Sequence, residues 1–360
     1  MLHAVIMAGG AGTRFWPASR TTTPKQLLEL FEDRTMIRAT VDRLVGLIPA
    51  DRLLVVTNEQ LVEPISRQLP DIPSGSILGE PCKRDTAPCI GLAAEVLLSV
   101  DPDATMLVMP ADHIIRPHGL FQQAVRQAVD LVEQRPKRLV TFGIRPTYPA
   151  DTFGYIERGA PLPSSHSAAP VYSVKMFREK PSVEVAEQYL AAGGYYWNAG
   201  IFVWKARTIR DALKRFEPKM SAHLAEIARQ LGTDEFPRTL AREFAAIRGT
   251  SIDYAVMERY DDVVVIEAPF DWDDVGNWRS LVRLRGTDEF GNTVVGKHLG
   301  LDSRDCIIRT TDDHLVVTLG MEDCIIVHTP DATLVARKQD EEAIRKVVEQ
   351  IKARGWGEYL

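Results

Sequence analysis

Short apolar runs alternate with longer amphipathic stretches along the first 145 residues of the chain. The runs at residues 2–7, 53–57, 76–78, 105–109 and 139–144 are rich in β-branched side chains and apolar on both faces, which is typical of buried strands. The stretches at 36–47, 61–68, 87–98 and 120–133 have the spacing of amphipathic helices. This alternation predicts a mostly parallel sheet covered by helices on both faces. Ligands of such sheets bind outside the carboxyl ends of the strands.

The pattern loosens after residue 145. Residues 161–170 are rich in Pro, Ser and Ala, which predicts a surface loop. Long strands are predicted at 171–179 and 196–204, and a further strand at 263–268. Several helices are predicted over 206–258, and Ser251 is a candidate N-cap within that region.

From about residue 290 the pattern changes to short β-rich runs, at 294–297, 306–309, 315–319, 324–328 and 334–336. The tetrapeptide Asp-Cys-Ile-Ile occurs at 305 and again at 323, and the offset of 18 residues equals one coil of a hexapeptide β-helix. The other intervals are irregular, so we expect two or three imperfect coils, followed by a helix at 340–353. The predicted domains are residues 1–285, with the sheet, and residues 286–360, a short β-helix with a C-terminal helix.

Composition and charge exclude several classes of protein. The 360 residues carry a net charge of −6 without a Lys/Arg stripe, so we expect no nucleic-acid partner. No run approaches the roughly 18 apolar residues of a membrane span, and the apolar start is too short for a signal peptide. The four cysteines form no C-x-x-C pair and the histidines are scattered, so we expect reduced thiols, no zinc site and a cytoplasmic location.

A glycine-rich segment follows the first predicted strand. Gly9, Gly10 and Gly12 would let the backbone approach a ligand and direct its N–H groups at an anion. The segment is not a Walker A loop, because no Lys-Ser/Thr follows the glycines, and Phe15 occupies the third glycine position of a dinucleotide fingerprint. Arg14 and the later Lys25 flank the segment, which would suit a triphosphate. The alternative is a tight turn with two solvated cations.

Seven segments in order resemble the sugar nucleotidyltransferase family, and within it the mannose-1-phosphate guanylyltransferases, also called GDP-mannose pyrophosphorylases. The resemblance covers nearly the whole chain. No single segment is specific for this family, but the occurrence of all seven in this order is. The segments are residues 9–17 with 24–26, residues 80–81 with 84–88, and residues 110–113, 177–181, 196–200, 251–254 and 272–276.

The resemblance implies a mostly parallel, Rossmann-like nucleotidyltransferase sheet with a short C-terminal left-handed β-helix. It also implies transfer of GMP from GTP to mannose 1-phosphate, by metal-assisted in-line attack on the α-phosphate, with pyrophosphate as leaving group. Such a reaction requires positioning and charge neutralisation by cations and Mg²⁺ (or another divalent cation) more than covalent help from the protein.

The resemblance assigns Asp112 and Asp274 as metal ligands. Asp112 directly follows the predicted strand at 105–109 and could instead cap the next turn, and Asp273 is chemically as able to bind a metal as Asp274. Arg14, Lys25 and Asp112 are the implied catalytic residues. The implied nucleotide-binding residues are Gly9, Gly10, Gly12, Thr13, Glu80, Asp85 and Thr86. Asp85 or Thr86 could alternatively cap the helix that begins near residue 87.

The implied sugar-phosphate site has Lys180 on the phosphate, Glu179 on sugar hydroxyls, Asn198 as donor and acceptor, and Gly154 for close backbone approach. Glu179 and Lys180 could instead form a surface ion pair, and Asn198 could be a satisfied core amide. The family pattern has a further glycine where this chain has Thr152, which puts sugar selectivity in question.

Other functions remain open on the sequence, among them a structural β-helix scaffold, which the short extent of the repeats disfavours. Another is the same reaction with another hexose 1-phosphate or nucleotide. A third is a non-catalytic regulatory subunit that binds a sugar nucleotide, although such a subunit would be expected to lose the loop cations or the metal carboxylates. An exposed end coil of a β-helix is an open sheet edge, so we expect a homodimer.

Overall fold

The computed structural model describes residues 1–360 except 11, 32, 164–168 and 312. The described chain divides into two compact units. One unit, here called the sheet unit, contains Met1–Gly9, Asp42–Ala111 and Ile115–Trp272. The other, here called the coil unit, contains Gly10–Val41, Asp112–Ile114 and Asp273–Leu360. The domain boundary after residue 285 stays a prediction.

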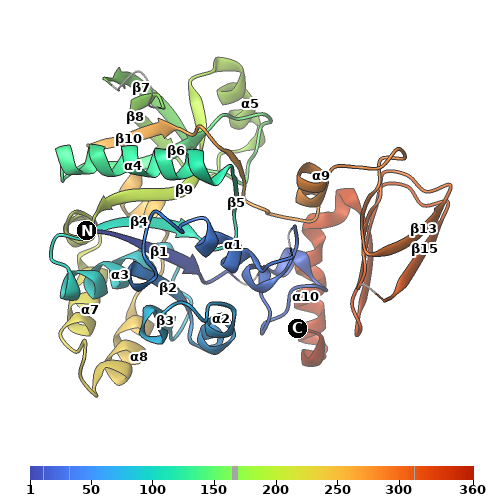
Figure 1. Ribbon diagram of the computed structural model, residues 1–360, viewed down its shortest axis with the longest axis horizontal. Coiled ribbons are helices and arrows are strands. Elements are labelled where there is room, and N and C mark those ends of the chain that lie inside the picture. The colour runs from blue at the N-terminus through green and yellow to red at the C-terminus, as the bar shows by residue number, and fades with distance from the viewer. Residues whose placement is uncertain (11, 32, 164–168, 312) are drawn as a thin grey trace. The chain divides into compact units, whose positions relative to one another are not determined.

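A nine-stranded mixed sheet forms the centre of the sheet unit (Figure 1). Its order is β3-β2-β1-β4-β9-β6-β10-β8-β7, and the pairings give β8 and β9 one direction and the other seven strands the opposite one. The predicted mostly parallel sheet is therefore confirmed. The strands are β1 (Leu2–Ala8), β2 (Leu53–Asn58), β3 (Ile77–Glu80), β4 (Thr105–Pro110), β6 (Leu139–Ile144), β7 (Tyr155–Leu162), β8 (Val171–Arg178), β9 (Tyr195–Lys205) and β10 (Val263–Glu267).

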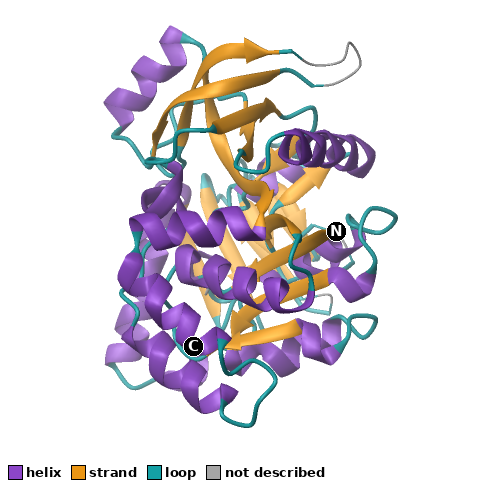
Figure 2. Cartoon of the chain, turned by 90° about the vertical axis from the view of Figure 1, so that its left-hand side faces the viewer, coloured by secondary structure: helices purple, strands orange, loops and turns teal. Residues whose placement is uncertain are grey.

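Helices cover both faces of this sheet, as predicted (Figures 1 and 2). Phe142 of β6 lies on the face that carries Phe121 of α4, and both rings pack against Phe270. Phe202 and Trp204 of β9 belong to the core under the helices of the opposite face. The helices of the sheet unit are α2 (Val62–Gln68), α3 (Thr86–Val100), α4 (His118–Gln134), α5 (Val183–Ala192), α6 (Ala206–Phe216), α7 (Pro218–Ala228) and α8 (Phe236–Ala246).

Two local predictions were wrong. The helix expected at 36–47 is α1 (Met36–Asp42), and the chain then continues in turns, in which the amides of Val45 and Leu47 bond to carbonyls three residues back rather than four. Strand β7 (Tyr155–Leu162) was not predicted, because Gly159 and Pro161 weaken the strand pattern. The predicted loop at 161–170 overlaps the end of β7, and residues 164–168 lie outside the described residues.

The coil unit contains the predicted short β-rich runs. Helix α9 (Ser280–Arg285) precedes them and α10 (Ile344–Ala353) closes the unit. Parallel strands pair in a ladder of β12, β14 and β16, while β17 joins β16 antiparallel and β13 pairs with β15. The strands are β12 (Thr293–Val295), β13 (Lys297–Leu301), β14 (Ile307–Arg309), β15 (Leu315–Leu319), β16 (Cys324–His328) and β17 (Thr333–Arg337).

The offset of 18 residues seen in the sequence is the register of these pairs. Ile307 pairs with Ile325 and Lys297 with Leu315, both 18 positions apart, whereas Thr293 pairs with Ile307 after only 14. The prediction of imperfect coils is therefore confirmed. The left-handed sense of the coils stays a prediction.

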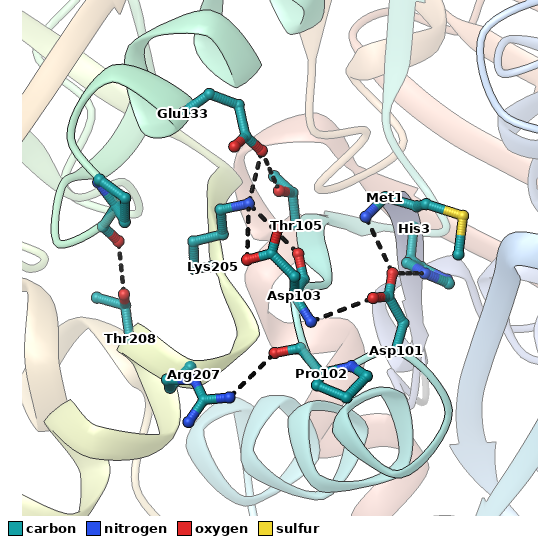
Figure 3. A network of polar contacts seen from close by, with 11 residues as sticks. Met1, His3, Asp101, Pro102, Asp103, Thr105, Glu133, Lys205, Arg207 and Thr208 are labelled. Carbon is teal, nitrogen blue, oxygen red and sulfur yellow. Dashed lines mark hydrogen bonds and ion pairs between the residues drawn. The ribbon is translucent and has the colours of Figure 1, made fainter.

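A network of polar contacts closes the amino edge of the sheet, where β1 and β4 begin and β9 ends (Figure 3). Asp101 accepts hydrogen bonds from the Met1 ammonium and contacts His3 Nε2, both at 3.0 Å. Lys205, which is buried, contacts Glu133 Oε1 at 2.7 Å. Strand β1 ends at Ala8, at the opposite, carboxyl edge of the sheet, and Gly9 follows it. No helix in the described part of the chain is both long and apolar enough to cross a membrane.

Candidate active site

The glycine-rich segment after β1 turns sharply, as its sequence predicts. Gly12 has a φ of 60°, and a Cβ there would lie 2.5 Å from Lys25 Cβ, so a side chain could not be accommodated. Thr13 and Arg14 belong to a 3₁₀ turn, and Ser19 Oγ donates to the Gly12 carbonyl. Glycine at 12 thus lets the segment that carries Lys25 pass against the loop. Residue 11 of the motif lies outside the described residues.

Three predicted residues from distant parts of the sequence meet in the coil unit. The buried Lys25 Nζ lies 2.8 Å from Asp112 Oδ2 and donates to the carbonyl oxygen of Asp274 at 2.6 Å. Arg14 donates through Nη1 to the carbonyl of Gly276 at 3.4 Å and through Nε to Glu342 at 3.1 Å. Arg14 is therefore attached to the loop of Asp274 rather than to Lys25 itself.

The loop of Asp274 has a strained backbone, and the Asp274 carboxylate lies close to the backbone of Gly276. Val275, a buried β-branched residue, has a φ of 49°, which such residues rarely adopt. A Cβ at Gly276 would lie 2.9 Å from Asp274 Oδ2. Asp273 accepts from Arg283 Nε at 2.7 Å and from the Val275 amide at 2.8 Å, which fixes the loop. The two adjacent carboxylates are thus separated: Asp273 is held by structural contacts and Asp274 lies beside the Lys25 group.

The two carboxylates beside Lys25 have opposite pKa shifts. Burial alone would raise the pKa of Asp112, but the charges of Lys25 and His113 outweigh burial and lower it. Burial raises the pKa of Asp274 to about 6, and the charges of Asp273 and Asp112 add to burial while Lys25 opposes it. A bound cation would relieve both the burial and the like-charge repulsion at Asp274.

The carboxylates of Asp112 and Asp274 lie close enough to each other to interact, and both lie beside Lys25. Among the described residues, no group of three or more His, Cys, Asp or Glu side chains could hold a metal. Mg²⁺ is commonly held by one or two carboxylates, with water and substrate phosphate as the other ligands.

The predicted sugar residues meet in the sheet unit. Asn198 N donates to the Gly154 carbonyl at 2.8 Å, and a Cβ at Gly154 would lie 2.5 Å from Glu179 Oε2. Glu179 Oε1 pairs with Lys180 Nζ at 2.7 Å. Lys180 has a φ of 43°, so the turn before Pro181 is strained. Gly154 therefore permits a close approach of Glu179 and Asn198 that any side chain would block.

The residues predicted for the base form a second group in the sheet unit. Glu80, buried at the end of β3, lies 3.7 Å from where a Cβ of Gly9 would be, and its Oε1 has no hydrogen-bond partner in the described structure. Burial raises the pKa of Glu80 to about 7, while a hydrogen bond with Cys89 lowers it. A buried acceptor without a partner is costly unless a ligand satisfies it.

Asp85 and Thr86 have structural contacts as well as a predicted ligand role. Asp85 precedes α3 and accepts a hydrogen bond from the Thr86 amide at 2.9 Å, so the alternative of a helix cap has support. Thr86 Oγ1 accepts from the Ile252 amide at 2.9 Å, which joins this loop to residues 250–253.

Sequence reasoning missed Asp253. Its Oδ1 accepts a hydrogen bond from Asn198 Nδ2 at 3.1 Å, and burial, with the charge of Glu179, raises its pKa to about 7. The residue lies in one of the motifs that carried the resemblance, but no role was assigned to it. Its burial beside Asn198, which the linear sequence does not show, was the missing signal.

The chain belongs to the nucleotidyl transferase family, whose pattern it matches over residues 3–289. Residues 296–351 match a second family, described as a MannoseP isomerase/GMP-like beta-helix domain. Relatives of the chain include mannose-1-phosphate guanylyltransferase 2 of Escherichia coli O157:H7, with 39% identity over 99% of this chain and 75% of the relative. Another is mannose-1-phosphate guanylyltransferase ManC of Salmonella typhimurium, with 40% identity over 99% of this chain and 75% of the relative.

A solved structure is similar over almost the entire chain. The crystal structure described as mannose-1-phosphate geranyltransferase from Thermus thermophilus superimposes with a TM-score of 0.86 and 34% sequence identity. The match covers 98% of this chain and 99% of that one. The fold predicted from the sequence, a nucleotidyltransferase sheet followed by a β-helical region, is thus confirmed.

Proposed function

We propose that the chain transfers GMP from GTP to mannose 1-phosphate, giving GDP-mannose and pyrophosphate. The observation that carries this proposal is the arrangement of Lys25 between Asp112 and the Asp274 loop, in a chain similar along its length to mannose-1-phosphate guanylyltransferases. A regulatory subunit that had lost catalysis would be expected to lack these groups. The proposed cellular location is the cytoplasm.

Residues of the glycine loop and of β3 would hold the nucleotide. Gly9, Gly10, Gly12 and Thr13 would direct backbone N–H groups at the phosphates. Arg14 and Lys25 would neutralise the charge that builds on the phosphates during displacement. The unpartnered Glu80 Oε1 is a suitable acceptor for a purine N–H or amino group. Asp85 and Thr86 would fix the position of the loop between β3 and α3 through their hydrogen bonds.

Asp112 and Asp274 would hold the magnesium ion. The ion would supply charge neutralisation at the α-phosphate and orient the triphosphate. Asp112 is already ionised, because its pKa is lowered, and Lys25 holds it in place through the 2.8 Å contact. Lys25 would thus both position a metal ligand and contact phosphate.

The sugar phosphate would bind in the sheet unit. Lys180 would contact its phosphate, and Glu179 and Asn198 would bind ring hydroxyls beside Gly154. This assignment rests on the close approach that Gly154 permits and on the alternation of acceptor and donor side chains around it.

The reaction is tested by measuring pyrophosphate release from each nucleoside triphosphate with each hexose 1-phosphate, with Mg²⁺ and with a chelator. We expect metal-dependent release that is fastest with GTP and mannose 1-phosphate. Asp112→Asn should lower kcat by at least about 100-fold, because a ligand of the metal loses its charge. The control is Asp313→Asn, since that side chain is fully exposed.

The outcomes separate the alternatives. Fastest release with another pair would overturn the assignment of base or sugar and retain the chemistry. Binding of sugar nucleotide without release from any pair would overturn the proposed enzyme in favour of a regulatory subunit.

We further propose that the chain forms a homodimer through the outer face of β13 and β15. Five aliphatic side chains of these strands are each more than half exposed, and Leu299 pairs with Val317 as Leu301 pairs with Leu319. Contiguous exposed apolar faces commonly mark interfaces, and a second copy presents the same face. The five residues are Leu299, Leu301, Leu315, Val317 and Leu319.

Sedimentation velocity across micromolar concentrations tests the dimer. The wild-type chain should sediment as a dimer and Val317→Glu as a monomer. Val45→Glu, a change at an exposed valine of the sheet unit, is the control and should leave the dimer intact. A wild-type monomer at all concentrations would contradict the proposal.

A further inference from the structure

Asn198 is locked in one orientation by its surroundings. Its Oδ1 accepts a hydrogen bond from the Gly200 amide at 3.2 Å and lies 3.0 Å from Thr141 Oγ1, whose one hydrogen it shares with the Ile201 carbonyl, also at 3.0 Å. Its Nδ2 donates to Asp253 Oδ1 at 3.1 Å. The oxygen is thus occupied by the strand, and the amide nitrogen, which carries two hydrogens, points to Asp253. Asn198 can therefore act toward a ligand as a donor, and Asp253 enforces that choice.

Asp253 lies in a segment that is anchored on two sides. On one side, the Ile252 amide donates to Thr86 Oγ1, and the Ala87 amide donates to the Thr250 carbonyl at 3.1 Å. On the other side, Glu258 Oε1 accepts from the Glu179 amide at 3.2 Å. The π-helical turn Asp253–Met257 thus connects the loop before α3 with the turn of Glu179. Asp253 is held at the junction rather than on a free loop.

The carboxyl groups of Asp253 and Glu179 lie close enough to interact electrostatically. The charge of Glu179 is, after burial, the largest cause of the raised pKa of Asp253, and Glu179 also lies against Gly154. Gly154 and Asn198 are in backbone contact. The absence of a side chain at Gly154 thus lets the Glu179 carboxyl lie against the backbone of residue 154, close to Asn198, whose amide Nδ2 donates to Asp253. Paired acceptors and a donor suit the adjacent hydroxyls of a hexose ring, since each hydroxyl can both donate and accept.

We propose that Asp253 is a sugar-recognition residue that accepts a hydrogen bond from one hexose hydroxyl and fixes Asn198 so that its amide donates to a neighbouring one. This inference rests on the proposed function, because it assigns a further residue to the same sugar site. It differs from a purely structural role, in which Asp253 would only hold Asn198 and the π-helical turn together.

Steady-state kinetics with altered sugars test the proposal. The substrates are mannose 1-phosphate and its 2-, 3-, 4- and 6-deoxy analogues, with saturating GTP and Mg²⁺. In the wild-type enzyme, removing the hydroxyl that Asp253 binds should lower kcat/KM by roughly 10- to 100-fold, because a buried carboxyl loses its partner. For Asp253→Ala, kcat/KM with mannose 1-phosphate should fall by a similar factor. With the deoxy analogue that lacks the hydroxyl bound by Asp253, the substitution should lower kcat/KM little further. The KM for GTP should stay within about twofold.

Two further variants keep the test decisive. Asp253→Asn retains an oxygen for the Asn198 amide, so it should preserve folding while changing the hydroxyl preference, and it replaces Asp253→Ala if the alanine variant does not fold. Asp261→Asn, at a side chain that is 87% exposed, is the matched control and should show the wild-type deoxy profile.

The outcomes distinguish the inference from the proposed function. If the wild type turns over mannose 1-phosphate but Asp253 variants lose the same factor on every analogue, or raise the KM for GTP equally, the inference is overturned and the proposed function stands. If the wild type turns over no hexose 1-phosphate, the proposed function fails and this inference fails with it.

Discussion

At the scale of single residues, Glu80 combines a destabilising environment with a proposed role. Burial raises the pKa of this carboxyl from 4.5 to about 7. The folded chain therefore binds this proton more tightly than the unfolded chain, and stability falls as pH rises from about 4.5 to 7. Above pH 7 the folded state has the full cost of a buried charge. A buried carboxylate with this raised pKa is consistent with a ligand that satisfies it.

Glu80→Gln should therefore stabilise the free protein and weaken nucleotide binding. We expect a gain of roughly 1–3 kcal/mol at pH 8 that shrinks toward pH 5, together with a higher KM for GTP. Urea unfolding at the two pH values, with parallel kinetics, measures both effects. The exposed Glu63→Gln is the control. A variant that is less stable than wild type at pH 8 would show that the carboxylate is satisfied within the protein.

At the scale of elements, residues between the strands of the coil unit adopt the left-handed backbone conformation at positions 18 residues, or one coil, apart. Asp302 has a φ of 49°, and Gly320, 18 positions later, has a φ of 64°. Asp305 and Asp323, also 18 apart, have φ values of 53° and 52°. Asp tolerates this conformation better than most residues with a side chain, and glycine adopts it without steric cost.

Asp302→Gly should then be neutral or stabilising, whereas Asp302→Val should destabilise by about 1–2 kcal/mol. Both substitutions remove the same carboxylate, so the difference between them isolates the backbone conformation. Thermal unfolding monitored by calorimetry measures the difference in melting temperature between the two variants. Equal melting temperatures for the two variants would contradict the argument.

The sequence predicted elements better than it predicted contacts. The Asp-Cys-Ile-Ile repeat gave the coil register because a parallel coil aligns equivalent residues at a fixed offset. The early end of α1 could not be predicted, since the apolar spacing continues past Asp42 while the chain turns. Asp273 and Asp274 could not be ranked from chemistry alone. Only the contact of Asp273 with Arg283 separates them, and the sequence gives no sign of that contact.

At the scale of the whole molecule, the chain order does not follow the compact units. Lys25, Asp112 and Asp274 come from three separate stretches and all belong to the coil unit. The residues proposed for base and sugar belong to the sheet unit. A cut of the chain anywhere between Lys25 and Asp274 would therefore separate members of the first group.

Contacts between residues far apart in the sequence, at the amino edge of the sheet, make the stability of the fold depend on pH in acid. Asp101, whose side chain is 10% exposed, accepts hydrogen bonds from the Met1 ammonium and the Asp103 amide and contacts His3 (Figure 3). Burial alone would raise its pKa, but these hydrogen bonds lower the pKa from 3.8 to about 2. The contacts join the start of β1 to the residue that follows α3, about 100 positions later along the chain.

The stabilisation by Asp101 should be complete above its unfolded pKa, near 3.8, and be lost as pH falls through about 2. Asp101→Asn should therefore cost about 1–2 kcal/mol at pH 6, and the difference from wild type should narrow between pH 4 and pH 2. Asp103→Asn is the control, because its carboxylate is 84% exposed and its contact with Lys205 is screened by water. Chemical unfolding at a series of pH values measures the difference. A cost that stays constant down to pH 2 would mean that Asp101 acts through the shape of its loop rather than through its charge.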